Sequence, residues 1–250
     1  MMLRGGTIFA RSWGMPNGPT VLCWHGAGGS SADYAQIAPD LAEGLNARVV
    51  AIDAPGHSQS SGLPPEAFMP SALAMVAVEI LDELDAEQAV IVGFSWGATV
   101  GCWLGALYPE RTLALALVEG GHFDFADLPG FRTDRTLAEL VAEAEAVATS
   151  ERAGFGSHTP AVAGAMVHGL CSEPATASYA RLAASRTPVL FVGASLEEPL
   201  AEVERLRRLV PQSEIVQLTS SGHDLLRDAP VDVAREVGGW LAEMPAFRGR

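Results

Sequence analysis

A serine between two glycines is the residue of this sequence best suited to chemistry. Ser95 stands in the run Gly93-Phe94-Ser95-Trp96-Gly97, after the apolar residues 89–92 and before a stretch of small residues. Flanking glycines allow the backbone to turn sharply from a strand into a helix, which lifts the hydroxyl above the sheet edge at a helix N-terminus. The run therefore predicts a nucleophilic serine, although ordinary glycine-rich turns can also contain it.

A base for this serine is expected close to the C-terminus. His223 follows the last apolar run, in the segment Gly222-His223-Asp224. A neutral imidazole can accept the serine proton and later return it to a leaving group. A purely structural hydrogen bond is the alternative role for His223.

Two glutamates compete for the role of the acid that orients the histidine. Glu119 ends an apolar run and lies 24 residues after Ser95, whereas Glu197 lies 26 residues before His223. Either carboxylate could hold the imidazole tautomer and stabilise its protonated form. The residues leave this choice open, and the unused glutamate would be a solvated loop acid or a salt-bridge partner.

Small residues after the first apolar run could bring backbone N–H groups close to the serine. The run His25-Gly26-Ala27-Gly28-Gly29 has this composition. An acyl-transfer transition state needs donors aimed at its developing oxyanion, and we assign them to the backbone amides of Ala27 and Trp96. A dinucleotide-binding glycine loop is the alternative, but Ser31 replaces its third glycine.

The elements that must position these residues alternate between strands and helices. Strands are predicted from short apolar runs at residues 20–24, 48–53, 89–93, 113–119, 188–193 and 214–218, with an antiparallel strand at 7–13. Helices are predicted from the periodicity of residues 71–84, 98–108, 200–209 and 231–244. This alternation is typical of a mostly parallel sheet with helices on both faces.

One interval breaks the alternation and predicts the domain organisation. Residues 122–186 are rich in Ala and Glu, so we expect a small helical cap inserted after the strand that ends at Glu119. Residues 1–121 and 187–250 would then form the α/β core. The helical run at 137–147 would lie over the C-terminal edge of the sheet and gate access to it.

Composition excludes several classes of function. The net charge of −14 disfavours nucleic acid and anionic membranes as partners. All 16 basic residues are arginine, which removes chemistry that needs an amine. The three cysteines form no metal or disulfide pattern, and no signal peptide is evident, so we expect a cytoplasmic protein without cofactor or metal.

Four motifs in order resemble the α/β-hydrolase superfamily: His25-Gly26, Asp53-x-x-Gly56-x-Ser58, Gly93-x-Ser95-x-Gly97 and Gly222-His223-Asp224. The resemblance covers nearly the whole chain outside the cap and implies serine-dependent hydrolysis, although the superfamily also contains lyases, peroxidases, acyltransferases and inactive members. This sequence departs from the common pattern because Leu196 stands where the acid is expected. The haloalkane dehalogenase branch can carry its acid where Glu119 stands, but that branch uses a carboxylate nucleophile.

A serine nucleophile favours acyl chemistry. We therefore expect a hydrolase that cleaves an ester or thioester of a small, largely apolar acyl substrate through an acyl-enzyme. Apolar side chains that could line its pocket are Trp24, Phe94, Phe123 and Phe125. Two alternatives remain: a cofactor-independent enzyme for C–C bond hydrolysis, acyl transfer or cyclisation, and a catalytically silent ligand-binding protein.

Overall fold

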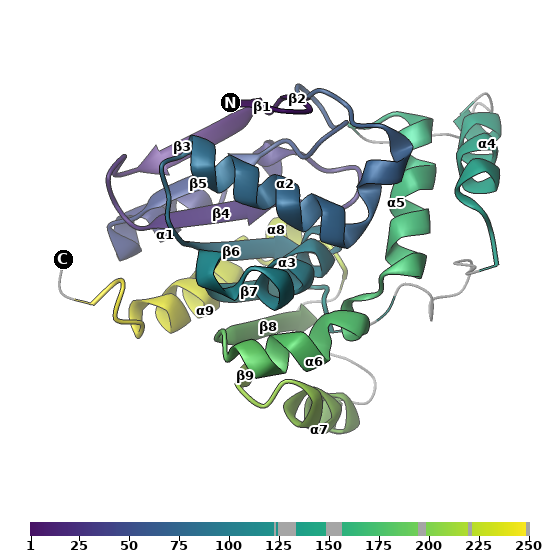
Figure 1. The fold of residues 1–250 in the computed structure, drawn as a ribbon. Helices are drawn as coiled ribbons and strands as arrows, with labels where there is room; N and C mark the ends of the chain where they lie inside the picture. Colours follow the sequence, from purple (N-terminus) through teal and green to yellow (C-terminus); the bar gives the residue numbers. More distant parts are fainter. Residues whose placement is uncertain (123, 125–133, 149–156, 195–198, 220–221, 249–250) are drawn as a thin grey trace.

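A seven-stranded sheet organises the chain (Figure 1). The computed structural model describes residues 1–122, 124, 134–148, 157–194, 199–219 and 222–248. The strand order is β3-β5-β4-β6-β7-β8-β9, in which β3 pairs antiparallel with β5 and the other pairs are parallel. The strands are β3 (Ala10–Gly14), β4 (Thr20–Trp24), β5 (Arg48–Ile52), β6 (Ala89–Phe94), β7 (Thr112–Val118), β8 (Val189–Ala194) and β9 (Ser213–Leu218). A small second sheet pairs β1 (Met2–Leu3) with β2 (Gly6–Thr7).

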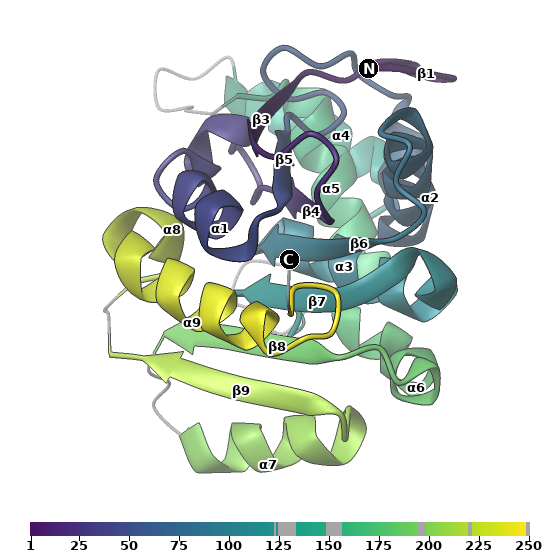
Figure 2. The ribbon, with the colours of Figure 1, turned by 90° about the vertical axis from the view of Figure 1, so that its left-hand side faces the viewer.

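Helices cover both faces of the large sheet (Figure 2). One face carries α2 (Pro70–Glu83), α3 (Trp96–Leu107), α6 (Ala175–Ser185) and α7 (Pro199–Leu209). The other face carries α1 (Ala38–Leu45), α8 (Leu225–Asp228) and α9 (Pro230–Ala242). The central strands β4 and β6 are buried along their whole length, as expected for parallel strands covered on both sides.

Two helices between β7 and β8 lie beyond the C-terminal ends of the central strands (Figure 1). They are α4 (Leu137–Ala148) and α5 (Pro160–Ser172), which pack against each other. The side chain of Thr159 caps α5 by accepting a hydrogen bond from the backbone N–H of Val162. α5 also packs on the short 3-10 helix η2 (Pro65–Phe68), whereas α6 packs on α3.

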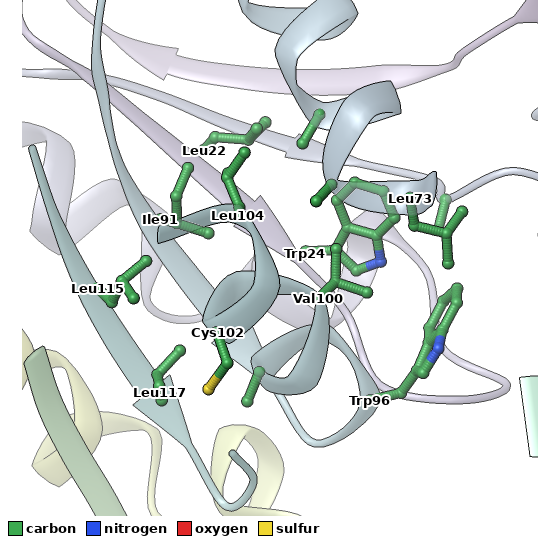
Figure 3. Packing of buried hydrophobic residues seen from close by; sticks show 14 of the residues in the cluster. Leu22, Trp24, Leu73, Ile91, Trp96, Val100, Cys102, Leu104, Leu115 and Leu117 are labelled. Carbon is green, nitrogen blue, oxygen red and sulfur yellow. The ribbon is translucent and has the colours of Figure 1, made fainter. Parts of the chain in front are cut away.

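The hydrophobic core has two parts, one on each face of the sheet. Figure 3 shows the part between the sheet and α2 and α3, where Trp24 and Trp96 lie beside Leu73 and Val100. Both tryptophans are at most 1% exposed. This packing joins α3 rigidly to the sheet, so the residue immediately before α3 is firmly placed.

The predicted mostly parallel sheet with helices on both faces is confirmed. The six parallel strands and four helices fall within two residues of their predicted bounds. The antiparallel N-terminal strand begins later, at Ala10, because Gly6 and Thr7 pair with β1 instead. Sequence reasoning missed α1, whose eight residues include Pro39 and Gly44. Among the described helices, none is long and apolar enough to cross a membrane.

Candidate active site

Ser95 occupies a strained turn between β6 and α3. Its backbone has φ 52° and ψ −112°, a conformation that residues with a side chain rarely adopt. The neighbouring glycine permits this turn because a Cβ on Gly97 would lie 2.2 Å from the carbonyl oxygen of Trp24. The backbone N–H of Ser95 donates to the carbonyl oxygen of Val118 at 2.9 Å. The serine hydroxyl is thus presented at the C-terminal edge of the sheet.

His223 reaches this hydroxyl from the loop between β9 and α8. Its Nε2 lies 2.8 Å from Oγ of Ser95, a hydrogen-bond distance. The ring of Phe94 packs against the imidazole with ring centroids 5.5 Å apart. Partial burial lowers the pKa of His223, more than the nearby Asp224 raises it. The imidazole is therefore neutral near pH 7 and able to accept a proton.

Glu119 stands behind the imidazole, directly after β7. Its Oε1 lies 4.0 Å from Nδ1 of His223, and its Oε2 accepts a 2.6 Å hydrogen bond from the backbone N–H of Ala194. Burial raises the pKa of Glu119, against the opposing effect of that hydrogen bond. The competing acid, Glu197, lies outside the described residues.

The loop after β4, residues 25–29, forms a tight turn beside the serine. We call it the oxyanion loop, after the role that the sequence predicts for the backbone amide of Ala27. The N–H of Gly29 donates to the carbonyl oxygen of Gly26 at 3.1 Å, and Gly28 has φ 75°. His25 holds the base of the turn, because its Nδ1 lies 2.7 Å from the Gly26 carbonyl and its Nε2 accepts from the N–H of Ala54 at 2.9 Å. Burial lowers the pKa of His25 to about 4, which keeps it neutral.

The two amides assigned to an oxyanion hole differ in their surroundings. Ala27 is exposed at the tip of the oxyanion loop. Trp96 is the first residue of α3, and the first N–H groups of a helix have no partner within it. Both amides are thus free of regular secondary-structure bonds, and the helix N-terminus favours a negative charge beside Ser95.

Residues 19–154 match the family described as alpha/beta hydrolase fold. The chain belongs to this family. A serine hydrolase-like protein of Danio rerio is 32% identical over 115 residues, which are 46% of this chain and 35% of that protein. Epoxide hydrolase B of Mycobacterium tuberculosis is 38% identical over 111 residues, which are 43% of this chain and 31% of that protein. The matched part thus spans about a third of each relative's own length.

A solved structure shares the fold over nearly its full length. It is a thermophilic esterase from Thermogutta terrifontis, with a TM-score of 0.79, 21% identity and coverage of 97% of this chain and 94% of the esterase. The matched family segment contains Ser95, Glu119 and the oxyanion loop, whereas His223 lies outside it.

Of the four aromatic residues expected to line a pocket, two lie outside the described residues, namely Phe123 and Phe125. Trp24 is buried in the core, edge to face with Trp96 at 6.1 Å between ring centroids. Phe94 borders a groove of about 450 Å³ that also touches the oxyanion loop. The other lining residues are Ala32, Asp33, Gln36, Asp224, Leu226 and Arg227.

Sequence reasoning missed a second set of histidines next to the candidate site. The rings of His57 and Trp96 stack with centroids 5.3 Å apart, and His158 stacks on the other side of His57 at 4.9 Å. Burial lowers the pKa of His57 to about 3. No local motif marks His158, so only the folded chain reveals this contact. Within the described residues, no cluster of three or more His, Cys, Asp or Glu side chains could hold a metal ion.

Proposed function

We propose that this protein is a serine hydrolase that cleaves an ester or thioester through an acyl-enzyme. The 2.8 Å contact between Ser95 Oγ and His223 Nε2, made at a strained strand-to-helix turn, is the observation that carries the proposal. A neutral imidazole at this distance is positioned to take the hydroxyl proton as the oxygen attacks a carbonyl carbon.

The reaction would proceed in two balanced halves. As Ser95 Oγ bonds to the acyl carbon, its proton passes to His223 and the carbonyl electrons move onto oxygen, where the amides of Ala27 and Trp96 would stabilise the charge. Collapse of this intermediate breaks the bond to the alcohol or thiol, which leaves with the proton from His223. Water then attacks the acyl-enzyme by the same route, releasing the acid and restoring the serine.

Glu119 is our choice for the acid that orients His223. It is fixed by the hydrogen bond from Ala194, and its free oxygen faces Nδ1 of His223 at 4.0 Å. This separation is about 1 Å longer than a hydrogen bond, and such contacts often tighten only when substrate binds. Glu119 also follows the strand adjacent to that of Ser95, which limits how far the two residues can move apart.

The substrate we propose is a small, largely apolar acyl ester or thioester, held between the sheet edge and a cap formed within residues 122–186. The apolar residues Val162, Met166 and Leu170 of α5 face the core on that side, which favours an apolar acyl group. The similarity in fold to an esterase agrees with this class of bond. A cytoplasmic location and a site without metal or organic cofactor belong to the same proposal.

Covalent labelling with a fluorophosphonate tests the proposal. We expect the intact mass of the wild type to increase by one probe adduct, and the Ser95→Ala variant to remain unlabelled. The Glu119→Gln variant should label much more slowly, whereas Glu197→Gln should label at the wild-type rate. Ser172→Ala, at an exposed serine, is the matched control. An unlabelled wild type would contradict the proposed function, and slow labelling of Glu197→Gln instead would reassign the acid.

A further inference from the structure

One serine from the region between β7 and β8 binds the last two residues of the oxyanion loop. The backbone N–H of Ser157 donates to the carbonyl oxygen of Gly28 at 3.1 Å. Its Oγ donates to the carbonyl oxygen of Gly29. A single residue therefore donates hydrogen bonds to both carbonyl groups at the end of the glycine-rich turn.

The same segment is anchored to a second loop beside the nucleophile. The carbonyl oxygen of Ser157 accepts a 2.6 Å hydrogen bond from the N–H of Ser58. The next residue, His158, forms an isolated β-bridge with His57, and their rings stack with an interplanar angle of 10°. His57 in turn stacks on Trp96, the residue after Ser95. The segment 157–158 thus links the oxyanion loop to the loop that contains His57 and Ser58.

This segment is also continuous with α5. Thr159 is the N-cap of that helix, so a displacement of α5 from the sheet edge would pull directly on Ser157. The connection is short, since only His158 separates the serine from the cap residue. The hydrogen bonds from Ser157 to Gly28 and Gly29 therefore depend on the position of α5.

The oxyanion loop needs such external contacts. Three of its five residues are glycine, and glycine gains more backbone freedom than any other residue when contacts are lost. Within the loop, the carbonyl group of Gly26 is held by His25 and by the turn hydrogen bond from Gly29. Oxyanion donors act only when they are fixed before the reaction, because reorganising them would cost free energy at the transition state.

We propose that Ser157 is a positioning residue, which holds the oxyanion loop in its catalytic shape and makes the oxyanion hole depend on the docking of α5. The inference rests on the proposed acyl chemistry. Ser157 does not touch the reacting atoms in this arrangement. It acts on the amide of Ala27 through the peptide groups of Gly28 and Gly29.

The variants Ser157→Ala and Ser157→Thr test the inference, with Ser172→Ala as a matched control at an exposed serine near the end of α5. Losing one hydrogen bond of ordinary strength should lower kcat for a p-nitrophenyl ester about fivefold. KM should stay within about twofold, because oxyanion donors act on the transition state and not on the bound substrate. Ser157→Thr keeps the hydroxyl and should restore the wild-type kcat.

Hydrogen exchange supplies a readout that does not depend on activity. We expect the backbone amides in the peptide covering residues 25–33 to exchange roughly fivefold faster in Ser157→Ala than in the wild type. The peptide covering α9 should be unchanged in both variants and in the control. This second peptide separates a local loosening of the loop from a general loss of stability.

The inference requires two results together for Ser157→Ala, a lower kcat and faster exchange in the peptide of residues 25–33. Unchanged exchange in the peptide of residues 25–33 overturns it whatever the activity, and faster exchange with an unchanged kcat overturns it as well. A rise in KM alone would assign Ser157 to substrate binding instead. A wild type that fluorophosphonate does not label would contradict the proposed function. The exchange experiment does not depend on labelling, so it would still show whether Ser157 holds the oxyanion loop.

Discussion

Two residues of the candidate site, Ser95 and Glu119, have positive φ angles of 52° and 48°. Each follows the last residue of a strand, and the two strands are neighbours, β6 and β7. Residues with a side chain are strained in this region, by an amount on the order of 1–3 kcal/mol each. The fold therefore holds both side chains in orientations that a relaxed strand end would not give. Backbone strain at the ends of two neighbouring strands is typical of active sites, where it holds side chains in the orientation that the reaction needs.

Replacement of Glu119 by glutamine should separate activity from stability. Burial raises the pKa of this carboxyl group above its ordinary value, so its charged form is disfavoured in the folded protein. That destabilisation is absent at low pH, where the group is protonated, and is fully present once the pH exceeds the raised pKa. Glu119→Gln should thus have a Tm equal to or above that of the wild type at pH 7, while kcat falls by ~10²- to 10⁴-fold.

Thermal unfolding of both proteins at several pH values checks this prediction. The difference in Tm, variant minus wild type, should shrink as the pH is lowered through the raised pKa of Glu119. Glu66→Gln, at an exposed glutamate, is the control and should change neither Tm nor kcat. A Glu119→Gln variant with lower Tm at pH 7 and wild-type kcat would give the carboxyl group a structural role only.

The pH profile of the reaction should reflect His223. Partial burial lowers its pKa below the ordinary value of 6.5. The protonated imidazole cannot accept the serine proton, so kcat/KM for a neutral ester should rise with pH and reach half of its plateau below pH 6.5. Measurements of kcat/KM between pH 4 and pH 9, in buffers of constant ionic strength, would locate this midpoint. A midpoint clearly above 6.5 would contradict a partly buried, neutral base.

At the scale of elements, the glycines around the nucleophile turn determine how closely strand, helix and loop approach. A Cβ on Gly97 would lie 2.2 Å from the backbone oxygen of Trp24, and one on Gly120 would lie 2.4 Å from that of Ser95. Both contacts are with backbone, which cannot rotate away. By contrast, Gly239 lies on α9 with nothing within 4 Å of its Cβ position.

Alanine at these glycines should therefore change stability in opposite directions. Gly97→Ala and Gly120→Ala should destabilise the fold by about 1–3 kcal/mol and displace Ser95. Gly239→Ala should stabilise α9 by up to about 1 kcal/mol, because alanine has the higher helix propensity. Urea unfolding curves measure both effects. Wild-type stability together with wild-type labelling of Gly120→Ala would show that the turn can shift without cost.

The sequence predicted those elements whose signals are local. The six parallel strands are short apolar runs, and the serine turn is a five-residue pattern, so both could be read directly. The short helix α1 was missed because it contains Pro39 and Gly44, which weaken a helical pattern. Glu119 and His223 are 104 positions apart in the sequence, and Ser157 lies 129 positions from Gly28 and 128 from Gly29. No local pattern contains information about contacts between residues so far apart.

At the scale of the whole molecule, charge should influence which substrates reach the site. The chain has a net charge of −14 and no lysine. The groove beside the oxyanion loop contains two carboxylates, Asp33 and Asp224, and one arginine, Arg227, which forms a 3.1 Å ion pair with Asp224. The local charge thus has the same sign as the overall charge. An ester that carries a carboxylate should be repelled on approach, and a neutral ester of the same size should not.

Salt provides the test of this repulsion. Raising ionic strength from ~0.01 M to ~0.15 M shortens the screening length from roughly 30 Å to roughly 8 Å. The kcat/KM of an anionic ester should then rise several-fold, that of a neutral analogue should stay constant, and that of a cationic analogue should fall. Asp33→Asn should reduce the salt dependence of both charged esters, because Asp33 lies within the groove. If the anionic ester instead reacts faster at low salt, a positive subsite must outweigh the net charge, and the substrate class would have to include acids.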